Sequence, residues 1–442
     1  MNKYSLYKDI GIEWMGEIPK HWVITKNRYG FRKYKNGKNE SNETKVLSLT
    51  TKGVKIKRNL NFGKSTESYI GHQLVEVGDV VFTPRDFDQT PILSDVSKYD
   101  GCISNLYIVD KTKQGVLNHF VNYYWYGLKY SVDYFKIFSH GMRYSFNRFQ
   151  FDEIPLLIPP LSEQKEIVSF LDDKTQKIDS LIQQKKEKIE LLKEKKTSLI
   201  NLVVTKGLDS NVEMKDSGVE WIDKIPSHWE SSKLGFYTTK IGSGSTPRGG
   251  SEVYVDSGIP FIRSQNVHFN GLRLDGVSYI KYEVHHSMKG STVVKEDVLL
   301  NITGGSIGRC CIVNVDGEMN VNQHVSIIRT TSKLKNHFLN YILSCDLGQS
   351  QVRFNMSGGN REGLTIEGIR DFQITLPPIL EQEQIVEYLD KQTEEIDTLI
   401  QLEQKKIDTL KEYRQSLISE VVTGKIKVCE EDNSLILNSQ TV

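Results

Sequence analysis

A chain of 442 residues is longer than one ordinary hydrophobic core accommodates, so its length predicts two globular units or more. Hydrophobic residues make up 38% of it and form no run long enough to span a bilayer, and the N-terminus lacks an apolar signal-peptide core, which argues against export. The net charge of +1 neither favours nor excludes a nucleic-acid partner. The five cysteines form no CxxC pair, which favours reduced thiols in the cytoplasm and predicts no metal site.

Positive charge is concentrated in one stretch near the N-terminus. Residues 26–58 contain eleven Lys or Arg residues and only two acidic ones, Glu40 and Glu43. A locally basic surface on a neutral chain is compatible with DNA binding, and the alternative is a lysine-rich surface that faces only solvent. The candidates for phosphate contacts are Lys33, Lys35, Lys55 and Lys57.

A short motif occurs twice outside the helices. GIEWMGEIPKHW at residues 11–22 returns as GVEWIDKIPSHW at residues 218–229, and four of the five tryptophans lie in these two copies. We interpret the tryptophans as packing a structural corner. His21 and His228 are expected to be packed or capping residues, because neither has a second ligand at metal spacing.

Two long stretches, residues 159–206 and 377–426, share one pattern and each begins at a Pro-Pro pair. Apolar residues recur at every third or fourth position over about five heptads, which predicts one apolar seam on each helix. Because such a seam needs a partner, we expect an antiparallel coiled coil whose helices, about 40 residues each, span roughly 60 Å. The predicted seam residues are Leu171, Ile178, Ile182, Lys185, Ile189, Leu192, Leu389, Ile396, Ile400, Glu403, Ile407 and Leu410.

One charged residue near the middle of each helix interrupts this seam. Lys185 and Glu403 occupy equivalent positions, so antiparallel packing is expected to bring them within about one turn of each other. Opposite charges at this place would help to set the register of the pair.

The remaining sequence forms two blocks, residues 24–158 and 231–376, which show no mutual resemblance at a glance. Both contain short β-type runs separated by Gly, Asn and Asp, which predicts mixed α/β structure. The fold class is therefore α+β, with two mixed α/β domains, two long antiparallel helices and an internal repeat. With their short motifs the domains cover residues 1–158 and 207–376, and residues 427–442 form a loose tail.

Signatures of an enzyme are missing from the sequence. The Gly-rich stretches at residues 242–250 and 303–310 lack the Gly-Lys-Ser/Thr ending of a Walker loop and the strand–helix context of a dinucleotide site. The Pro-Pro pairs follow Ile158 and Leu376, so neither belongs to an Asp/Asn-Pro-Pro-aromatic methyltransferase motif. We therefore predict no catalytic residue and no bound metal.

Loops of both blocks carry side chains suited to reading bases. In the major groove Arg pairs with guanine, and Asn or Gln pairs with adenine, through two hydrogen bonds each. Individually such residues are more often plain surface, but together they form a candidate reading face. The candidates are Arg85, Arg143, Arg148, Arg248, Arg263, Gln265, Asn266, Arg309, Gln323 and Arg361.

The whole arrangement, from about residue 11 to 426, resembles the specificity subunit of type I restriction-modification systems. The resemblance depends on the repeated EW-x₄-P-x-HW motif, on PP-x₂-EQ-x₂-IV-x₂-[FY]LD at the start of each helix, and on the stretches GIPFIRSQNV and TGGSIGR. It implies that the two blocks are target recognition domains for an asymmetric, split DNA sequence, and that the helices are a spacer and docking platform.

The resemblance also implies partners that supply the chemistry. Two methyltransferase subunits would bring S-adenosylmethionine, and restriction subunits would bring ATP- and Mg²⁺-dependent translocation and cleavage, so this chain itself would bind no cofactor. Two alternatives stay open at the level of sequence. One is a specificity subunit for a fused methyltransferase-nuclease of another restriction class, and the other is a coiled-coil scaffold that does not bind DNA.

Overall fold

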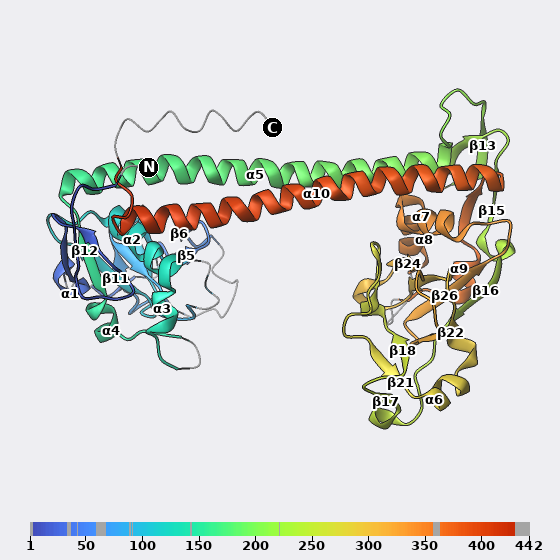
Figure 1. The fold of residues 1–442 in the computed structure, drawn as a ribbon, viewed down its shortest axis with the longest axis horizontal. Helices are drawn as coiled ribbons and strands as arrows, with labels where there is room; N and C mark the ends of the chain where they lie inside the picture. Colours follow the sequence, from blue (N-terminus) through green and yellow to red (C-terminus); the bar gives the residue numbers. More distant parts are fainter. Residues whose placement is uncertain are drawn as a thin grey trace. The chain divides into compact units, whose positions relative to one another are not determined.

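The computed structural model describes residues 3–32, 37–41, 43–58, 68–87, 90, 92–141, 144–220, 222–356 and 363–428. The chain divides into two compact units, which are described separately. Unit 1 comprises Met1–Lys186 and Gln404–Val442, and unit 2 comprises Glu187–Glu403. Each unit therefore contains one mixed α/β block together with about half of each long helix (Figure 1).

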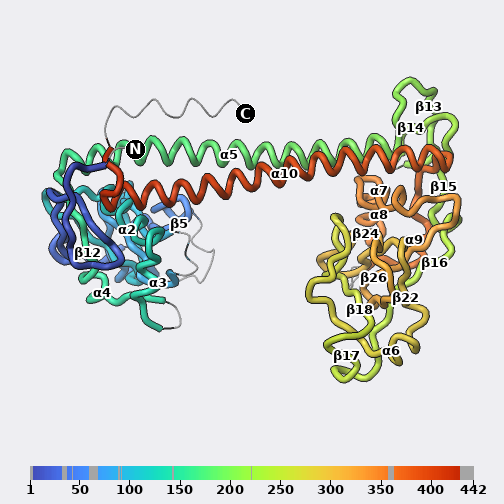
Figure 2. The backbone as a smooth tube through the Cα atoms, in the orientation of Figure 1, coloured from blue at the N-terminus to red at the C-terminus, as the bar shows by residue number. Residues whose placement is uncertain are grey.

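The two long helices are α5 (Leu161–Lys206) and α10 (Ile379–Val422), and each starts directly after its Pro-Pro pair. They pack together in antiparallel directions, as predicted (Figure 2). In unit 2, Lys196 Nζ donates to Asp397 Oδ2 at 2.6 Å; in unit 1, Arg414 Nε lies 3.0 Å from Asp179 Oδ1. Residues further along α5 therefore contact residues earlier in α10, which shows that the two helices run antiparallel.

The predicted seam lies between the two helices and is apolar except at its midpoint. Glu403 is only 2% exposed, and its Oε1 accepts from Lys188 Nζ at 3.0 Å. Lys188 lies one turn beyond Lys185, so the lysine in this ion pair is not the predicted one. The proximity of Lys185 to Glu403 stays a prediction. Lys185, Leu192, Ile400 and Leu410 are partly buried, and the buried members are Leu171, Ile178, Ile182, Ile189, Leu389, Ile396, Glu403 and Ile407.

The block of unit 1 is built around a four-stranded antiparallel sheet in the order β4-β11-β8-β9. Helix α2 (Asn118–Val132) buries Phe120, Tyr124 and Trp125. The sheet strands are β4 (Phe31–Arg32), β8 (Val80–Phe82), β9 (Ser94–Val96) and β11 (Ile108–Thr112). Around them lie the pairs β1 (Tyr7–Lys8) with β2 (Ile18–Pro19), β3 (Val23–Lys26) with β12 (Pro155–Ile158), β5 (Leu47–Thr50) with β6 (Gly53–Ile56), and β7 (Gln73–Val75) with β10 (Gly101–Ile103), together with α1 (Asn27–Gly30), α3 (Tyr134–Ile137) and α4 (Arg148–Glu153).

The block of unit 2 has a four-stranded antiparallel sheet in the order β16-β26-β23-β24 and a separate five-stranded sheet in the order β17-β21-β18-β25-β22. Helices α7 (Asn336–Ser344) and α8 (Asp346–Asn355) lie between α10 and the four-stranded sheet (Figure 1), and one hydrophobic core joins all three layers. The first sheet comprises β16 (Thr238–Ser243), β23 (Val298–Asn301), β24 (Cys310–Ile312) and β26 (Val325–Thr330). The second comprises β17 (Tyr254–Val255), β18 (Ile259–Ile262), β21 (Ser278–Ile280), β22 (Thr292–Val293) and β25 (Met319–Val321). The other elements are β13 (Met214–Val219), β14 (Ile222–Pro226), β15 (Glu230–Lys233), β19 (Val267–His268), β20 (Gly271–Leu272), β27 (Gln373–Leu376), α6 (Tyr282–Ser287) and α9 (Ile366–Arg370).

The two four-stranded sheets are copies of each other, which corrects the interpretation that the blocks do not resemble one another. Ile108 pairs with Phe82 in unit 1 and Ser326 pairs with Leu300 in unit 2, so both partners are displaced by 218 residues. The repeat was hidden because buried strands need only apolar residues of suitable shape, such as VVF in β8 and VLL in β23. The loops between the strands differ, and they dominate the appearance of the sequence.

Candidate nucleic-acid interface

A glutamate in the first turn of α5 joins the N-terminal motif to the helix. Trp22 is fully buried, and its indole Nε1 donates to Glu163 Oε1 at 3.1 Å. His21 Nε2 lies 2.8 Å from the other oxygen, Oε2. A carboxylate at this position also interacts favourably with the positive end of the helix dipole. The motif that the sequence repeats is therefore one half of a clamp, and Glu163 is the other half.

The same clamp holds the start of α10 in unit 2. Trp229 Nε1 and His228 Nε2 lie 3.0 and 2.9 Å from Glu381 Oε2. Each tryptophan also packs near the glycine that ends the opposite helix. A Cβ on Gly207 would lie 3.2 Å from the Trp229 ring, and one on Gly424 would lie 3.3 Å from the Trp22 ring. Each motif thus fastens the start of one helix to the end of the other.

A buried glutamine follows each of these glutamates. Gln164 Oε1 accepts from Leu117 N at 2.8 Å, just before α2, and Gln382 Oε1 accepts from Lys335 N at 2.8 Å, just before α7. Both amides are fully buried. The Glu-Gln pair of each helix signature therefore attaches a different segment with each side chain.

Two tyrosines complete the repeated junctions. Tyr123 on α2 donates to Asp172 at 2.7 Å, and Tyr341 on α7 donates to Asp390 at 2.6 Å. Burial raises the pKa of both tyrosines well above the ordinary value, so the hydroxyls stay protonated donors. These contacts hold α2 and α7 against the long helices.

Loops that the sequence singled out in unit 2 meet at one end of the four-stranded sheet. The end of β16, the end of β23 and the start of β26 lie there, because these neighbours are antiparallel. Gly244 N donates to Val325 O at 3.0 Å, and Ile302 N donates to His324 O at 3.0 Å. A Cβ on Gly244 would lie 2.0 Å from Val321 O, so only glycine permits this approach. The loops around residues 244–249, 302–309 and 321–324 are thus directly hydrogen-bonded to one another.

The GIPFIRSQNV stretch joins the same group of loops. Asn301 is fully buried at the end of β23, and its Nδ2 donates to Ser264 O at 2.8 Å and to Ser306 Oγ at 3.1 Å. Asn322 N donates to Ile262 O at 3.0 Å. Asn301 was not among the predicted site residues, since a buried asparagine at a strand end gives no signal of its partners in sequence.

The predicted reading residues of unit 2 occupy different settings within this group. Asn266 is 2% exposed; its Oδ1 accepts from Arg263 N at 3.0 Å and its Nδ2 donates to Arg273 O at 2.9 Å, so it holds its own loop in shape. Arg361 lies outside the described residues. Arg263 and Arg309 are partly buried, and the exposed members are Arg248, Gln265 and Gln323.

In unit 1 the loop that follows β8 occupies the same end of the equivalent sheet. It carries Arg85, which is exposed, and it is joined to the segment before α4 by the hydrogen bond from Phe146 N to Pro84 O at 2.8 Å. Lys55 is exposed on β6, and Lys57 is partly buried just beyond it. Lys33, Lys35 and Arg143 lie outside the described residues.

Arg148, also predicted to read bases, is engaged in two ion pairs. Its Nη2 lies 2.8 Å from Asp110 Oδ2, and its Nε lies 3.0 Å from Asp152 Oδ1. Burial raises the pKa of Asp110 to about 6, although the Arg148 guanidinium opposes this rise. Arg148 therefore compensates a buried carboxylate and fixes α4 to β11.

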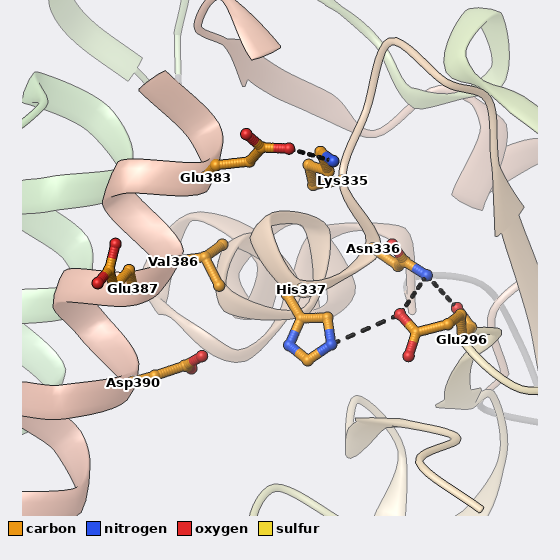
Figure 3. A pocket seen from close by; sticks show the side chains of 8 residues that line it. All are labelled: Glu296, Lys335, Asn336, His337, Glu383, Val386, Glu387 and Asp390. Carbon is orange, nitrogen blue, oxygen red and sulfur yellow. Dashed lines mark hydrogen bonds and ion pairs between the residues drawn. The ribbon is translucent and has the colours of Figure 1, made fainter. Parts of the chain in front are cut away.

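A pocket of about 470 Å³ lies elsewhere in unit 2, between the first turns of α10 and the start of α7 (Figure 3). Its lining is mainly acidic, with Glu296, Glu383, Glu387 and Asp390 around Lys335 and His337. Lys335 pairs with Glu383, and His337 Nε2 lies 3.5 Å from Glu296 Oε2. An acidic lining repels phosphates, so this pocket is not part of the candidate DNA interface.

The described residues contain neither a metal-binding cluster nor a membrane-spanning helix. In them, no group of three or more His, Cys, Asp or Glu side chains is placed to hold a metal ion. Nor does any helix in that part of the chain combine the length and apolar character that a bilayer crossing requires.

Similarity to known proteins agrees with this arrangement. The family model described as "Type I restriction modification DNA specificity domain" matches residues 32–191 and 226–412. A Methanocaldococcus jannaschii protein named as the specificity subunit of type I restriction enzyme MjaX is 22% identical over 431 residues, 94% of this chain and 96% of its own length. The MjaVIII specificity subunit from the same organism is 24% identical over 283 residues, and this match spans 63% of either chain.

Solved structures share the fold. A chain from a structure titled "Structural basis underlying complex assembly and conformational transition of the type I R-M system" superposes with a TM-score of 0.70 at 15% identity, covering 92% of this chain and 99% of that one. The HsdS subunit from Thermoanaerobacter tengcongensis superposes with a TM-score of 0.50 at 15% identity, covering 92% and 98%. The family match covers well over half of the sequence, and the repeated junctions and sheets account for it in structural terms. The chain belongs to the type I restriction-modification specificity subunits, the non-catalytic, DNA-binding part of such systems.

Proposed function

We propose that this chain recognises a gapped, asymmetric DNA sequence, with unit 1 reading one half and unit 2 reading the other. The observation that carries the proposal is the internal repeat. Each unit presents loops from the same end of its own four-stranded sheet. The loops differ, since Arg85 follows β8 in unit 1 and a glycine-rich turn follows β23 in unit 2. Equal scaffolds with unlike loops favour two unlike half-sites at a fixed gap of about one to two turns of DNA.

The phosphate contacts in this proposal come from basic residues of the N-terminal stretch. Lys33, Lys35, Lys55 and Lys57 are the candidates in unit 1. Since each neutralised phosphate releases counterions, binding should weaken steeply as salt increases. Arg and Gln side chains at the loop tips would supply the discrimination between bases.

Two methyltransferase subunits are the proposed partners of the helix pair. The repeat supports two equivalent docking surfaces, because Leu181 on α5 and Leu399 on α10 are related by the same 218-residue displacement and are both 43% exposed. In this assembly S-adenosylmethionine would bind to the methyltransferase subunits, and ATP and Mg²⁺ to restriction subunits. The complex would act on DNA in the cytoplasm.

Methylome sequencing tests this function. The gene would be expressed together with its methyltransferase gene in a host without other adenine methylation, and the modified bases compared with those of a host that carries the methyltransferase alone. We expect one gapped motif with a modified adenine on each strand. A motif without a gap, or none that depends on this chain, would contradict the proposal.

A further inference from the structure

Gln323 is the exposed residue at the tip of the loop between β25 and β26, among the loops that meet in unit 2. Its amide is held at both ends. Thr246 Oγ1 donates to Gln323 Oε1 at 2.7 Å, and Gln323 Nε2 lies 3.0 Å from His324 Nε2. Thr246 belongs to the first Gly-rich stretch, so two loops far apart in sequence determine the orientation of one side chain.

The donor and acceptor roles in this series of hydrogen bonds can be assigned without conflict. An amide nitrogen can only donate, so His324 Nε2 is the acceptor. A neutral imidazole that accepts at Nε2 carries its proton on Nδ1, so Nδ1–H donates to Thr303 Oγ1, and these two heavy atoms are 2.5 Å apart. Thr303 begins the second Gly-rich stretch. The hydrogen bonds therefore run without conflict from Thr246 through Gln323 and His324 to Thr303.

The backbone beneath this chain is also fixed. Ser245 N donates to Val321 O at 3.3 Å, and Thr246 follows directly. Gly244 approaches Val321 so closely that no larger residue fits. Because the Gln323 side chain is already ordered before DNA binds, binding costs less conformational entropy than it would for a flexible glutamine.

The Gln323 amide keeps part of its hydrogen-bonding capacity free for a base. One N–H is used by His324 and one oxygen lone pair by Thr246, which leaves one N–H donor and one acceptor lone pair. Adenine presents the complementary pair in the major groove, N7 as acceptor and N6–H₂ as donor. Guanine presents two acceptors there, N7 and O6, and cannot satisfy both groups of the amide.

We propose that Gln323 reads an adenine in the half-site recognised by unit 2, and that Thr246, His324 and Thr303 are positioning residues that keep its amide oriented for that base. This proposal rests on the proposed DNA-reading function and adds a base and a residue to it. Loss of the contact should reduce discrimination at one A·T pair by roughly tenfold or more. Other positions of the motif should keep their identity.

The test uses the full chain with its methyltransferase and compares methylated motifs by sequencing. Gln323→Ala should make one A·T pair of one half-motif degenerate, at a position other than the modified adenine. Thr246→Val should relax the same position to a smaller extent, and Thr246→Ser, which keeps the hydroxyl, should restore it. A residue with a merely structural role would reduce methylation at every site without changing the motif at one position.

Asn105 provides a matched control, because it occupies the equivalent loop position in unit 1, displaced by 218 residues, and donates through Nδ2 to Gly71 O at 3.0 Å. Asn105→Ala should leave the position controlled by Gln323 unchanged. An unaltered motif for Gln323→Ala, or loss of the same position in Asn105→Ala, overturns the inference. If Gln323→Ala abolishes methylation altogether, competition binding with duplexes that carry each base at that position decides, and undiminished preference for A·T refutes the assignment. Failure of the wild-type chain to direct any gapped motif would instead refute the proposed function.

Discussion

At the start of each long helix a single carboxylate accepts hydrogen bonds from a tryptophan and lies beside a histidine of a distant motif. Glu163 and Glu381 are more than three-quarters buried, with side chains 16% and 24% exposed. Both tryptophans are fully buried, so their indole N–H groups have no access to water as an alternative partner. The glutamate therefore stabilises the fold mainly because, without it, the buried indole N–H of the tryptophan would have no hydrogen-bond acceptor.

Removing either carboxylate should destabilise the unit to which it belongs. We expect Glu163→Ala and Glu381→Ala each to reduce the free energy of unfolding by about 1–3 kcal/mol, which lowers Tm by several degrees. Thermal unfolding monitored by calorimetry measures this. Glu190→Ala is the matched control, because Glu190 lies on α5 with its side chain 66% exposed and its ion pair with Lys193 should contribute little. Equal Tm values for Glu381→Ala and Glu190→Ala would contradict the clamp.

At the level of elements, the contact between α2 and α10 depends on the absence of a side chain. Gly127 lies inside α2, where alanine would normally be favoured by up to about 1 kcal/mol. A Cβ there would lie 2.3 Å from Val422 Cγ2, which is buried and cannot give way freely. Close packing of two helices, not a turn, explains this glycine.

The sign of the Gly127→Ala effect should therefore depend on residue 422. In the wild-type background we expect destabilisation by about 1–3 kcal/mol from overpacking. In a Val422→Ala background the same change should stabilise the protein, because the helix propensity of alanine then acts without the clash. Denaturant unfolding of the four proteins measures this double-mutant cycle. A Gly127→Ala change that is neutral or stabilising in both backgrounds would refute the close-packing explanation.

At the scale of the whole molecule, the repeat makes each recognition block a replaceable part. Gln164 and Gln382 lie on the long helices and accept from the backbone N–H groups of Leu117 and Lys335 inside the blocks, whereas the reading loops differ between the units. A backbone donor does not depend on the side chain, so a substituted block can keep this junction. The hydrophobic core of unit 2 includes residues of α5 and α10, so a substituted block must preserve the apolar residues that face them.

Replacing residues 231–376 with the corresponding block of another specificity subunit should change one half of the methylated motif. The other half and the gap between them should persist, because unit 1 and the helices are unaltered. Methylome sequencing of the chimera checks this, with the equivalent replacement of residues 24–158 as the reciprocal control. A chimera in which both halves changed would show that the blocks do not read independently.

The sequence by itself determined the two long helices, the repeated motif and the division into two blocks. Heptad spacing and proline positions are local signals, and the periodicity alone predicts that residues such as Leu171 and Ile407 are buried. Antiparallel packing in turn predicted that Lys185 lies near Glu403, and in the structure Lys188, one turn further along α5, forms an ion pair with Glu403.

Only the tertiary structure decided which distant groups meet. It showed that each block contains its own copy of the same four-stranded sheet, a repeat that the sequence hides because strand pairing tolerates many apolar residues. It placed Arg148 in ion pairs with Asp110 and Asp152, and it connected Thr246 to Gln323 and Thr303 to His324. Hydrogen-bond partners more than 20 residues apart are fixed by the packing of loops on a common sheet, and no local pattern encodes that packing.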